Sequence, residues 1–264
     1  MLQNSSPDQA MQFDHLVIFV ADLDSAINDF TDLGFNVTRG GSHGLTENAL
    51  IIFANQSYIE LLALKPFITN PLMAIANRLG ILHWQSERKA SLYSRLLRWV
   101  NGDVGPVDWC VRVTDLAVAS ERWKEAGLDL LGSETFARKR IDGEIVRWHL
   151  GGVKNHNLPI LLEDITALDQ RVPLVDAVHG NQGVELLEVQ FAVTDAVVAC
   201  DMASKFLGGE SSSDKPLMVG NVKISFAAQS VQSGICLSIA YPGKRVKQLD
   251  LSKPYGLRVM LVPG

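Results

Sequence analysis

Three stretches of this chain repeat one pattern, and the repetition limits the fold more than any other feature of the sequence. Each stretch begins with an extended apolar segment, passes an aspartate into a helical segment, turns at a glycine and continues into further strands. The three stretches are His15–Phe35, Asp108–Leu128 and Glu188–Gly209. Each unit therefore has the order βαβββ, and we predict an α+β fold whose modules are related by internal pseudo-symmetry.

The three units share an aspartate at the same position of the pattern, and these residues are Asp22, Asp115 and Asp195. Each follows a predicted strand and opens a predicted helix, where a carboxylate accepts hydrogen bonds from the free amides of the first turn. We therefore predict that these aspartates cap helices, and we assign them no chemistry.

The repeats also suggest how the chain is divided. Residues 13–166 are expected to form a pair of βαβββ modules with a helical insert at 66–103. Residues 167–183 are expected to link this pair to a third βαβββ-like module with a C-terminal strand, at 184–264. Within the insert, helical spacing of leucines and flanking signals predict two helices, Pro71–Arg78 and Glu87–Val100.

Side chains alternate across a strand, so each strand offers an apolar face to its own helix and a second face to a cavity. On the second faces, a gap-free alignment places His15 and Glu60 of the first unit near Asp108 and Glu163 of the second. An imidazole among carboxylates suits a divalent metal such as Fe, Mn, Zn, Ni or Co, with His15, Glu60 and Asp108 as expected ligands. Two alternatives stay open: the acids line a solvated rim without metal, or a one-residue slip puts Trp109 in place of Asp108.

Several segments together carry a resemblance to a known family. They are FDHLVIFVADLDSA (13–26), GFNVTRGGSHGLTEN (34–48), YIELLAL (58–64), DWCVRVTDL (108–116), ARKRIDGEIVRWHL (137–150) and LPILLED (158–164). They resemble the glyoxalase-like domain family of the vicinal oxygen chelate superfamily. The resemblance implies paired βαβββ modules that form cupped mixed sheets around a site. It also implies a metal, held by His and Glu of paired modules, that chelates neighbouring substrate oxygens.

The second unit departs from the pattern of that superfamily, since Asp108 or Trp109 stands where a second histidine is expected. Two side chains are predicted to act as the catalytic base. His43 follows a permissive glycine turn in GGSHG, and Glu163 is the acid of the last strand of the second unit.

Four further residues are predicted to bind the substrate. Arg138 offers a planar guanidinium to a carboxylate, and the family pattern favours it. Asn48 either hydrogen-bonds the substrate or caps a turn. Trp109 and Trp148 are candidates for an aromatic wall, although large core residues are the commoner role of tryptophan.

We predict a small-molecule enzyme of lyase, isomerase or dioxygenase type, and the alternative is a metal-free protein that binds an aromatic or antibiotic-like ligand. A net charge of −5 provides no field that attracts nucleic acid, and the longest apolar runs are far too short to span a membrane. Three widely spaced cysteines suggest no disulfide framework and a cytoplasmic location. Because an unpaired third module leaves an exposed sheet edge, we expect a homodimer.

Overall fold

The computed structural model describes residues 11–43, 46–65, 91–101, 104–140, 142–207, 217–229, 234–250 and 255–264. Helix α4 (Leu92–Asn101) falls in the region of the second helix predicted for the insert. The predicted helix Pro71–Arg78 lies outside the described residues. None of the described helices is both long enough and apolar enough to cross a membrane.

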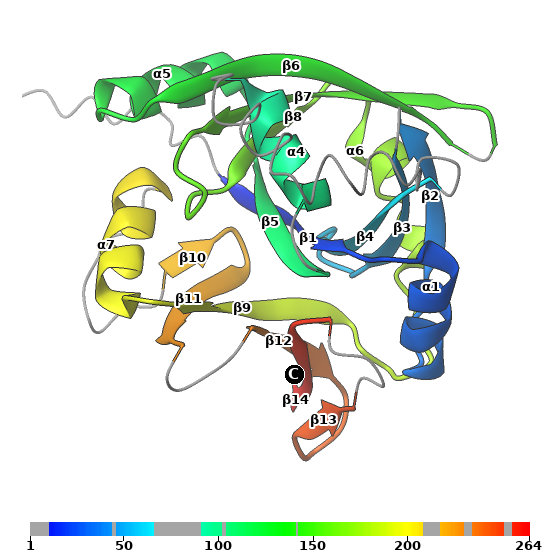
Figure 1. Ribbon diagram of the computed structural model, residues 1–264. Coiled ribbons are helices and arrows are strands. Elements are labelled where there is room, and N and C mark those ends of the chain that lie inside the picture. Colours follow the sequence, from blue (N-terminus) through cyan, green and yellow to red (C-terminus); the bar gives the residue numbers. More distant parts are fainter. Residues whose placement is uncertain are drawn as a thin grey trace, which may run out of the picture.

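Eight strands close into a barrel in the order β1-β4-β3-β2-β6-β7-β8-β5 (Figure 1). The first half contains β1 (Gln12–Phe19), α1 (Leu23–Asp32), β2 (Thr38–His43), β3 (Thr46–Ile52) and β4 (Tyr58–Leu64). The second half contains β5 (Gly105–Arg112), α5 (Leu116–Glu125), β6 (Leu130–Lys139), β7 (Ile145–Val153) and β8 (Ile160–Asp164). Strand β1 pairs with β4 in parallel and with β5 antiparallel, so the sheet is mixed, and the predicted fold class is confirmed.

The predicted helix caps are also present. The backbone amides of Ser25, Val118 and Val198 donate to the side chains of Asp22, Asp115 and Asp195 at 2.7, 2.9 and 3.1 Å. These aspartates therefore begin the helices and take no part in a site.

The two halves of the barrel meet along β1 and β5, and this pairing shows which positions correspond. The paired residues are His15 with Cys110, Leu16 with Trp109 and Val17 with Asp108. The pairing is symmetric about Leu16 and Trp109, so His15 and Asp108 occupy equivalent positions, as the gap-free alignment places them. Trp109 then lies on the outer face of the barrel, where its ring stacks against Phe13.

The last strands of the two halves give a different result. On β4, Glu60 pairs with Val17 of β1, and on β8, Ile160 pairs with Cys110 of β5. Ile160 is therefore the counterpart of Glu60. The structure corrects the expected equivalence of Glu60 and Glu163, because Glu163 lies three positions further along β8.

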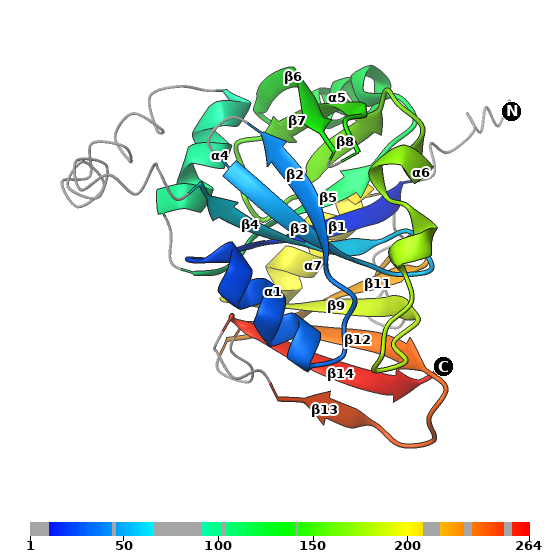
Figure 2. The same cartoon turned by 90° about the vertical axis from the view of Figure 1, so that its right-hand side faces the viewer.

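The remaining strands form a second sheet in the order β10-β11-β9-β12-β14-β13, which lies beneath β1 and β5 (Figures 1 and 2). Its elements are β9 (Glu185–Val193), α7 (Ala196–Leu207), β10 (Leu217–Val219), β11 (Val222–Ala228), β12 (Ile235–Tyr241), β13 (Lys247–Leu249) and β14 (Leu257–Pro263). One apolar core joins the outer face of the barrel to this sheet. A separate cluster of apolar side chains lies inside the barrel.

A short connection joins the barrel to the second sheet. It contains helix α6 (Leu168–Arg171) and a 3-10 turn, η2 (Leu174–Asp176). Helix α6 lies over the barrel (Figure 2), and its last residue, Arg171, lines the cavity inside the barrel.

Candidate active site

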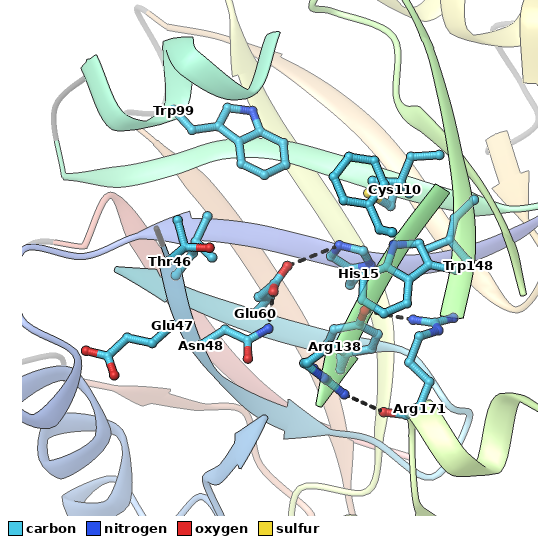
Figure 3. Close-up of a pocket in the computed structure, with 15 residues that line it drawn as sticks. His15, Thr46, Glu47, Asn48, Glu60, Trp99, Cys110, Arg138, Trp148 and Arg171 are labelled. Atoms are coloured by element: carbon cyan, nitrogen blue, oxygen red, sulfur yellow. Dashed lines mark hydrogen bonds and ion pairs between the residues drawn. The ribbon is translucent and has the colours of Figure 1, made fainter. Parts of the chain in front are cut away.

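A cavity of about 140 Å³ lies inside the barrel, and residues from both halves line it (Figure 3). Its wall is mostly apolar and consists of Leu62, Trp99, Phe136, Trp148, Leu150 and Leu162. Several polar side chains, among them His15, Asn48, Glu60 and Arg138, converge on this wall. A concave apolar wall with a few convergent polar groups is typical of a small-molecule site.

The position of His15 depends on an irregularity in β1. The pairing of β1 with β5 shifts between Phe13 and His15, so Asp14 is an extra residue in the strand. Such a bulge changes the direction of neighbouring side chains. As a result, Asp14 and His15 contact each other although they are adjacent in a strand, with Asp14 Oδ1 2.7 Å from His15 Nδ1.

Asp14 is a fully buried carboxylate that is held in its charged form. Arg171 of α6 donates to both of its oxygens, at 2.9 and 2.7 Å, and Arg112 lies 3.2 Å away. Burial alone would raise the pKa of Asp14, but Arg171 and His15 hold this pKa far below its usual value. Asp14 therefore presents a fixed negative charge to the Nδ1 side of His15.

The other ring nitrogen of His15 faces Glu60. His15 Nε2 lies 3.4 Å from Glu60 Oε2, and the imidazole stacks on Tyr58 with 4.5 Å between ring centroids. Burial alone would lower the pKa of His15, but the ionised carboxylate of Asp14, which binds Nδ1, raises it well above its usual value. At neutral pH the ring is therefore an imidazolium between two carboxylates.

Glu60 is ionised for related reasons. Burial would raise its pKa, but the hydrogen bond and charge of His15, a hydrogen bond from Asn48 and the charge of Arg138 lower it. The amide nitrogen of Asn48 donates to Glu60 Oε1. The pocket thus holds an ion pair of His15 and Glu60, with one carboxylate oxygen oriented by an amide.

Arg138 of β6 adds a second positive charge to the cavity. Its side chain is only 6% exposed, and Nη2 donates to the backbone oxygen of Arg171 at 3.3 Å. Burial lowers the pKa of this guanidinium, although the nearby Tyr58 and Glu60 favour its charged form. The geometry points the cation at the same cavity as Glu60 (Figure 3).

Arg171 connects several buried side chains of the site through hydrogen bonds. It is 2% exposed and donates to Asp164 at 2.6 and 3.0 Å and to the hydroxyl of Tyr58 at 2.8 Å, in addition to Asp14. Sequence reasoning missed Asp14, Tyr58 and Arg171. The sequence does indicate that Tyr58 faces the cavity, because it shares a strand face with Glu60. Arg171 lies far from the other site residues in the sequence, and no pattern there predicts its role.

The predicted site residues separate into two groups. His15, Asn48, Glu60, Arg138 and Trp148 all line the cavity. Asp108, Trp109 and Glu163 are not among its lining residues, and the side chain of His43 lies outside the described part of the chain.

Each of these remaining residues has its own surroundings. Asp108 faces the barrel interior, but its carboxylate accepts two hydrogen bonds from Arg95 of α4, at 2.6 and 2.7 Å, and one from Trp99 at 3.0 Å. Glu163 accepts from the backbone amide of Leu116, at the first residue of α5, at 2.8 Å. His43 is the last residue of β2, and its backbone pairs with Thr46.

Among the residues that the structure describes, the donor set does not fit a resident divalent metal. His15 and Glu60 supply two ligands, but Asp108 is held by Arg95, and the counterpart of Glu60 is the apolar Ile160. Within the described ranges, no group of three or more His, Cys, Asp or Glu side chains could hold an ion. Catalytic zinc sites use three protein ligands, so two donors fall short of such a site.

Comparison with known proteins identifies the family. The sequence matches the family described as "Glyoxalase-like domain" over residues 13–205. The chain belongs to this family. The match covers both halves of the barrel and reaches into α7, in agreement with the resemblance found in the sequence.

Solved structures also match this glyoxalase-like protein, and those with TM-scores of 0.70 and 0.50 share its fold. A hypothetical protein from Staphylococcus aureus is 14% identical, with 96% of this chain and 99% of that chain covered and a TM-score of 0.70. A variant of homoprotocatechuate 2,3-dioxygenase from B. fuscum is 11% identical, with 98% and 73% covered and a TM-score of 0.50. Methylmalonyl-CoA epimerase from Mycobacterium tuberculosis is 19% identical, with 63% and 97% covered and a TM-score of 0.37. No curated protein sequence matches significantly.

Proposed function

We propose that this glyoxalase-like protein is an enzyme that transfers a proton at a carbon atom next to a carbonyl group. One observation carries the proposal: the buried ion pair of His15 and Glu60, 3.4 Å apart, opens on an apolar cavity. General acid and base groups of this kind typically act from within such a pocket. The reaction belongs to the isomerase and lyase types predicted from the sequence.

The proposed step uses the charges that the two residues already carry. Glu60, an ionised carboxylate, takes the proton as the carbon–hydrogen bond breaks. The electron pair of that bond moves onto the carbonyl, whose oxygen becomes negative. The imidazolium of His15 donates Nε2–H to this oxygen, and the return of the proton to the carbon skeleton completes an isomerisation.

Asp14 and Tyr58 support this step without contacting the reacting atoms. Asp14 binds Nδ1 and so fixes the ring with Nε2 toward the cavity, and Tyr58 holds the plane of the ring. The apolar wall excludes water, which strengthens the attraction between the imidazolium and the developing negative charge.

A second candidate function is metal-free binding of an apolar ligand. The wall formed by Trp99, Phe136 and Trp148 favours it, since Phe136 and Trp148 stack with centroids 6.4 Å apart. A binding protein would hold a ligand without any turnover, so a proton-exchange experiment separates the two functions.

The test is deuterium incorporation from D2O into the methylene group next to the ketone of 2-oxo-4-phenylbutanoate, followed by NMR. We expect wild-type protein to accelerate the exchange and Glu60→Gln to slow it by about 100-fold or more. Glu134→Gln, an exposed acid of β6, is the matched control and should exchange at the wild-type rate. Wild-type protein that binds the probe without exchange would support the binding function, and full exchange by Glu60→Gln would overturn the assignment of the base.

A further inference from the structure

Arg138 is a buried cation that lacks an acidic partner. It is 6% exposed, its Nε has no hydrogen-bond partner, and no carboxylate of the described residues forms an ion pair with it. By contrast, the equally buried Arg171 and Arg95 each bind an aspartate. A buried charge without a partner is costly, so a site that retains one is suited to a ligand that supplies the missing anion.

Asn48 presents a second unsatisfied polar atom to the same region. Its amide nitrogen donates to Glu60, and an ionised carboxylate accepts but does not donate, so the orientation of the amide is fixed. The amide oxygen therefore points away from Glu60. This oxygen is buried and has no hydrogen-bond partner among the described residues. It requires a donor.

Gly40 of β2 brings these two groups together. A Cβ built on Gly40 would lie 2.7 Å from Nη1 of Arg138 and would also clash with the amide oxygen of Asn48. The two side chains thus pack against the bare backbone of Gly40, and any larger residue there would displace them. Arg138 and Asn48 also line the barrel cavity, so both face a ligand bound where His15 and Glu60 meet.

We propose that the cavity binds a carboxylic acid with a hydroxyl group on the adjacent carbon, with the carboxylate on Arg138 and the hydroxyl donating to Asn48. A guanidinium recognises a carboxylate with two planar donors, and a lone buried acceptor selects for a ligand hydroxyl. The apolar wall then receives the rest of the molecule. This inference rests on the proposed function in one respect, since the enol that the proposed proton transfer forms from a 2-oxo acid carries such a hydroxyl group next to its carboxylate.

The experiment is calorimetric titration of wild-type protein with 2-hydroxy-4-phenylbutanoate and with 4-phenylbutanoate, which lacks only the hydroxyl group. We expect the hydroxy acid to bind at least about tenfold more tightly, because the buried amide oxygen gains a partner. Arg138→Met should weaken both acids at least about tenfold, and Asn48→Val should remove the preference for the hydroxyl group.

Two further variants keep the test decisive. Gly40→Ala retains both side chains but displaces them, so we expect it to weaken binding of the hydroxy acid even if Arg138→Met fails to fold. Arg140→Met removes a cation two positions along the chain, which binds Asp142 and the backbone of Gln170, and should leave affinity unchanged. Equal affinity for the two acids, or unchanged binding by Gly40→Ala and Arg138→Met, would overturn the inference.

Binding and exchange report on different claims. Selective binding of the hydroxy acid without proton exchange would remove the proposed function but keep the anion site. Exchange that continues unchanged in Gly40→Ala and Arg138→Met, with no selectivity in binding, would keep the proposed function and remove the anion site.

Discussion

At the scale of single residues, one extra residue in β1 determines the character of the histidine in the site. Without the bulge at Asp14, this carboxylate and His15 would point to opposite faces of the strand. With it, Asp14 binds Nδ1 at 2.7 Å and stabilises the charged ring. The same carboxylate binds Arg171, so the connection after the barrel contributes to the protonation state of the site.

This charged ring leads to a pH-dependent stability. The pKa of His15 is raised in the folded protein, so the stabilisation is fully present below the unfolded value of 6.5 and is lost as pH rises through the folded pKa. We expect the difference in unfolding free energy between wild type and His15→Gln to be largest below pH 6.5 and to shrink at alkaline pH. Urea unfolding over a pH series measures it.

The control for this series is His149→Gln, which replaces a histidine that contacts Thr135 outside the cavity. This variant controls for the general effect of replacing a histidine by glutamine. A difference between wild type and His15→Gln that grows as pH rises would contradict the charged state assigned to the ring.

Sequence reasoning succeeded where a local pattern determined the geometry. The alternation along β1 and β4 was enough to bring His15 and Glu60 to one cavity, because parallel neighbouring strands keep their faces aligned. It failed for Glu163, since the equivalence of the last strands depends on the pairing register, which the sequence of β8 does not specify. The cationic partner of Asp108 could not be found either, because Arg95 reaches it only after α4 has packed on the barrel.

At the scale of elements, α4 shows how an inserted helix converts a potential metal ligand into a structural residue. Arg95 and Asp108 have fully buried side chains, and Arg95 also donates to the backbone oxygens of Val153 and Leu158. The ion pair therefore attaches the helix to β5 and closes this end of the barrel. The position equivalent to His15 is thus used for stability in the second half of the barrel.

We expect Arg95→Met to reduce the free energy of unfolding by about 3–5 kcal/mol, because it leaves the carboxylate of Asp108 buried and unpaired. The double variant Arg95→Met with Asp108→Leu should recover part of this loss, since no unpaired charge then remains. Urea unfolding of the wild type, both single variants and the double variant gives the coupling energy. Losses that simply add would show that the two residues do not form the pair described.

At the scale of the whole molecule, the second sheet occupies the face of β1 and β5 that is turned away from the cavity. Trp109 lies there, 4% exposed, with its ring 5.2 Å from Phe191 of β9. Trp148 lies in the cavity wall instead. The two tryptophans predicted as one aromatic wall therefore lie on different sides of the barrel. Trp109 packs against the second sheet, and Trp148 lines the cavity.

This separation predicts opposite phenotypes for two similar substitutions. Trp109→Ala should cost about 3–5 kcal/mol of unfolding free energy, as expected for a large aromatic residue lost from a core, while the folded protein keeps its affinity for 2-hydroxy-4-phenylbutanoate. Trp148→Ala should weaken that binding by about tenfold with a smaller loss of stability, since its half-buried ring faces the cavity. Urea unfolding and calorimetric titration of both variants provide the comparison. Loss of affinity in Trp109→Ala with unchanged stability would contradict the placement of the second sheet, because the ring would then have to contact the ligand and not Phe191.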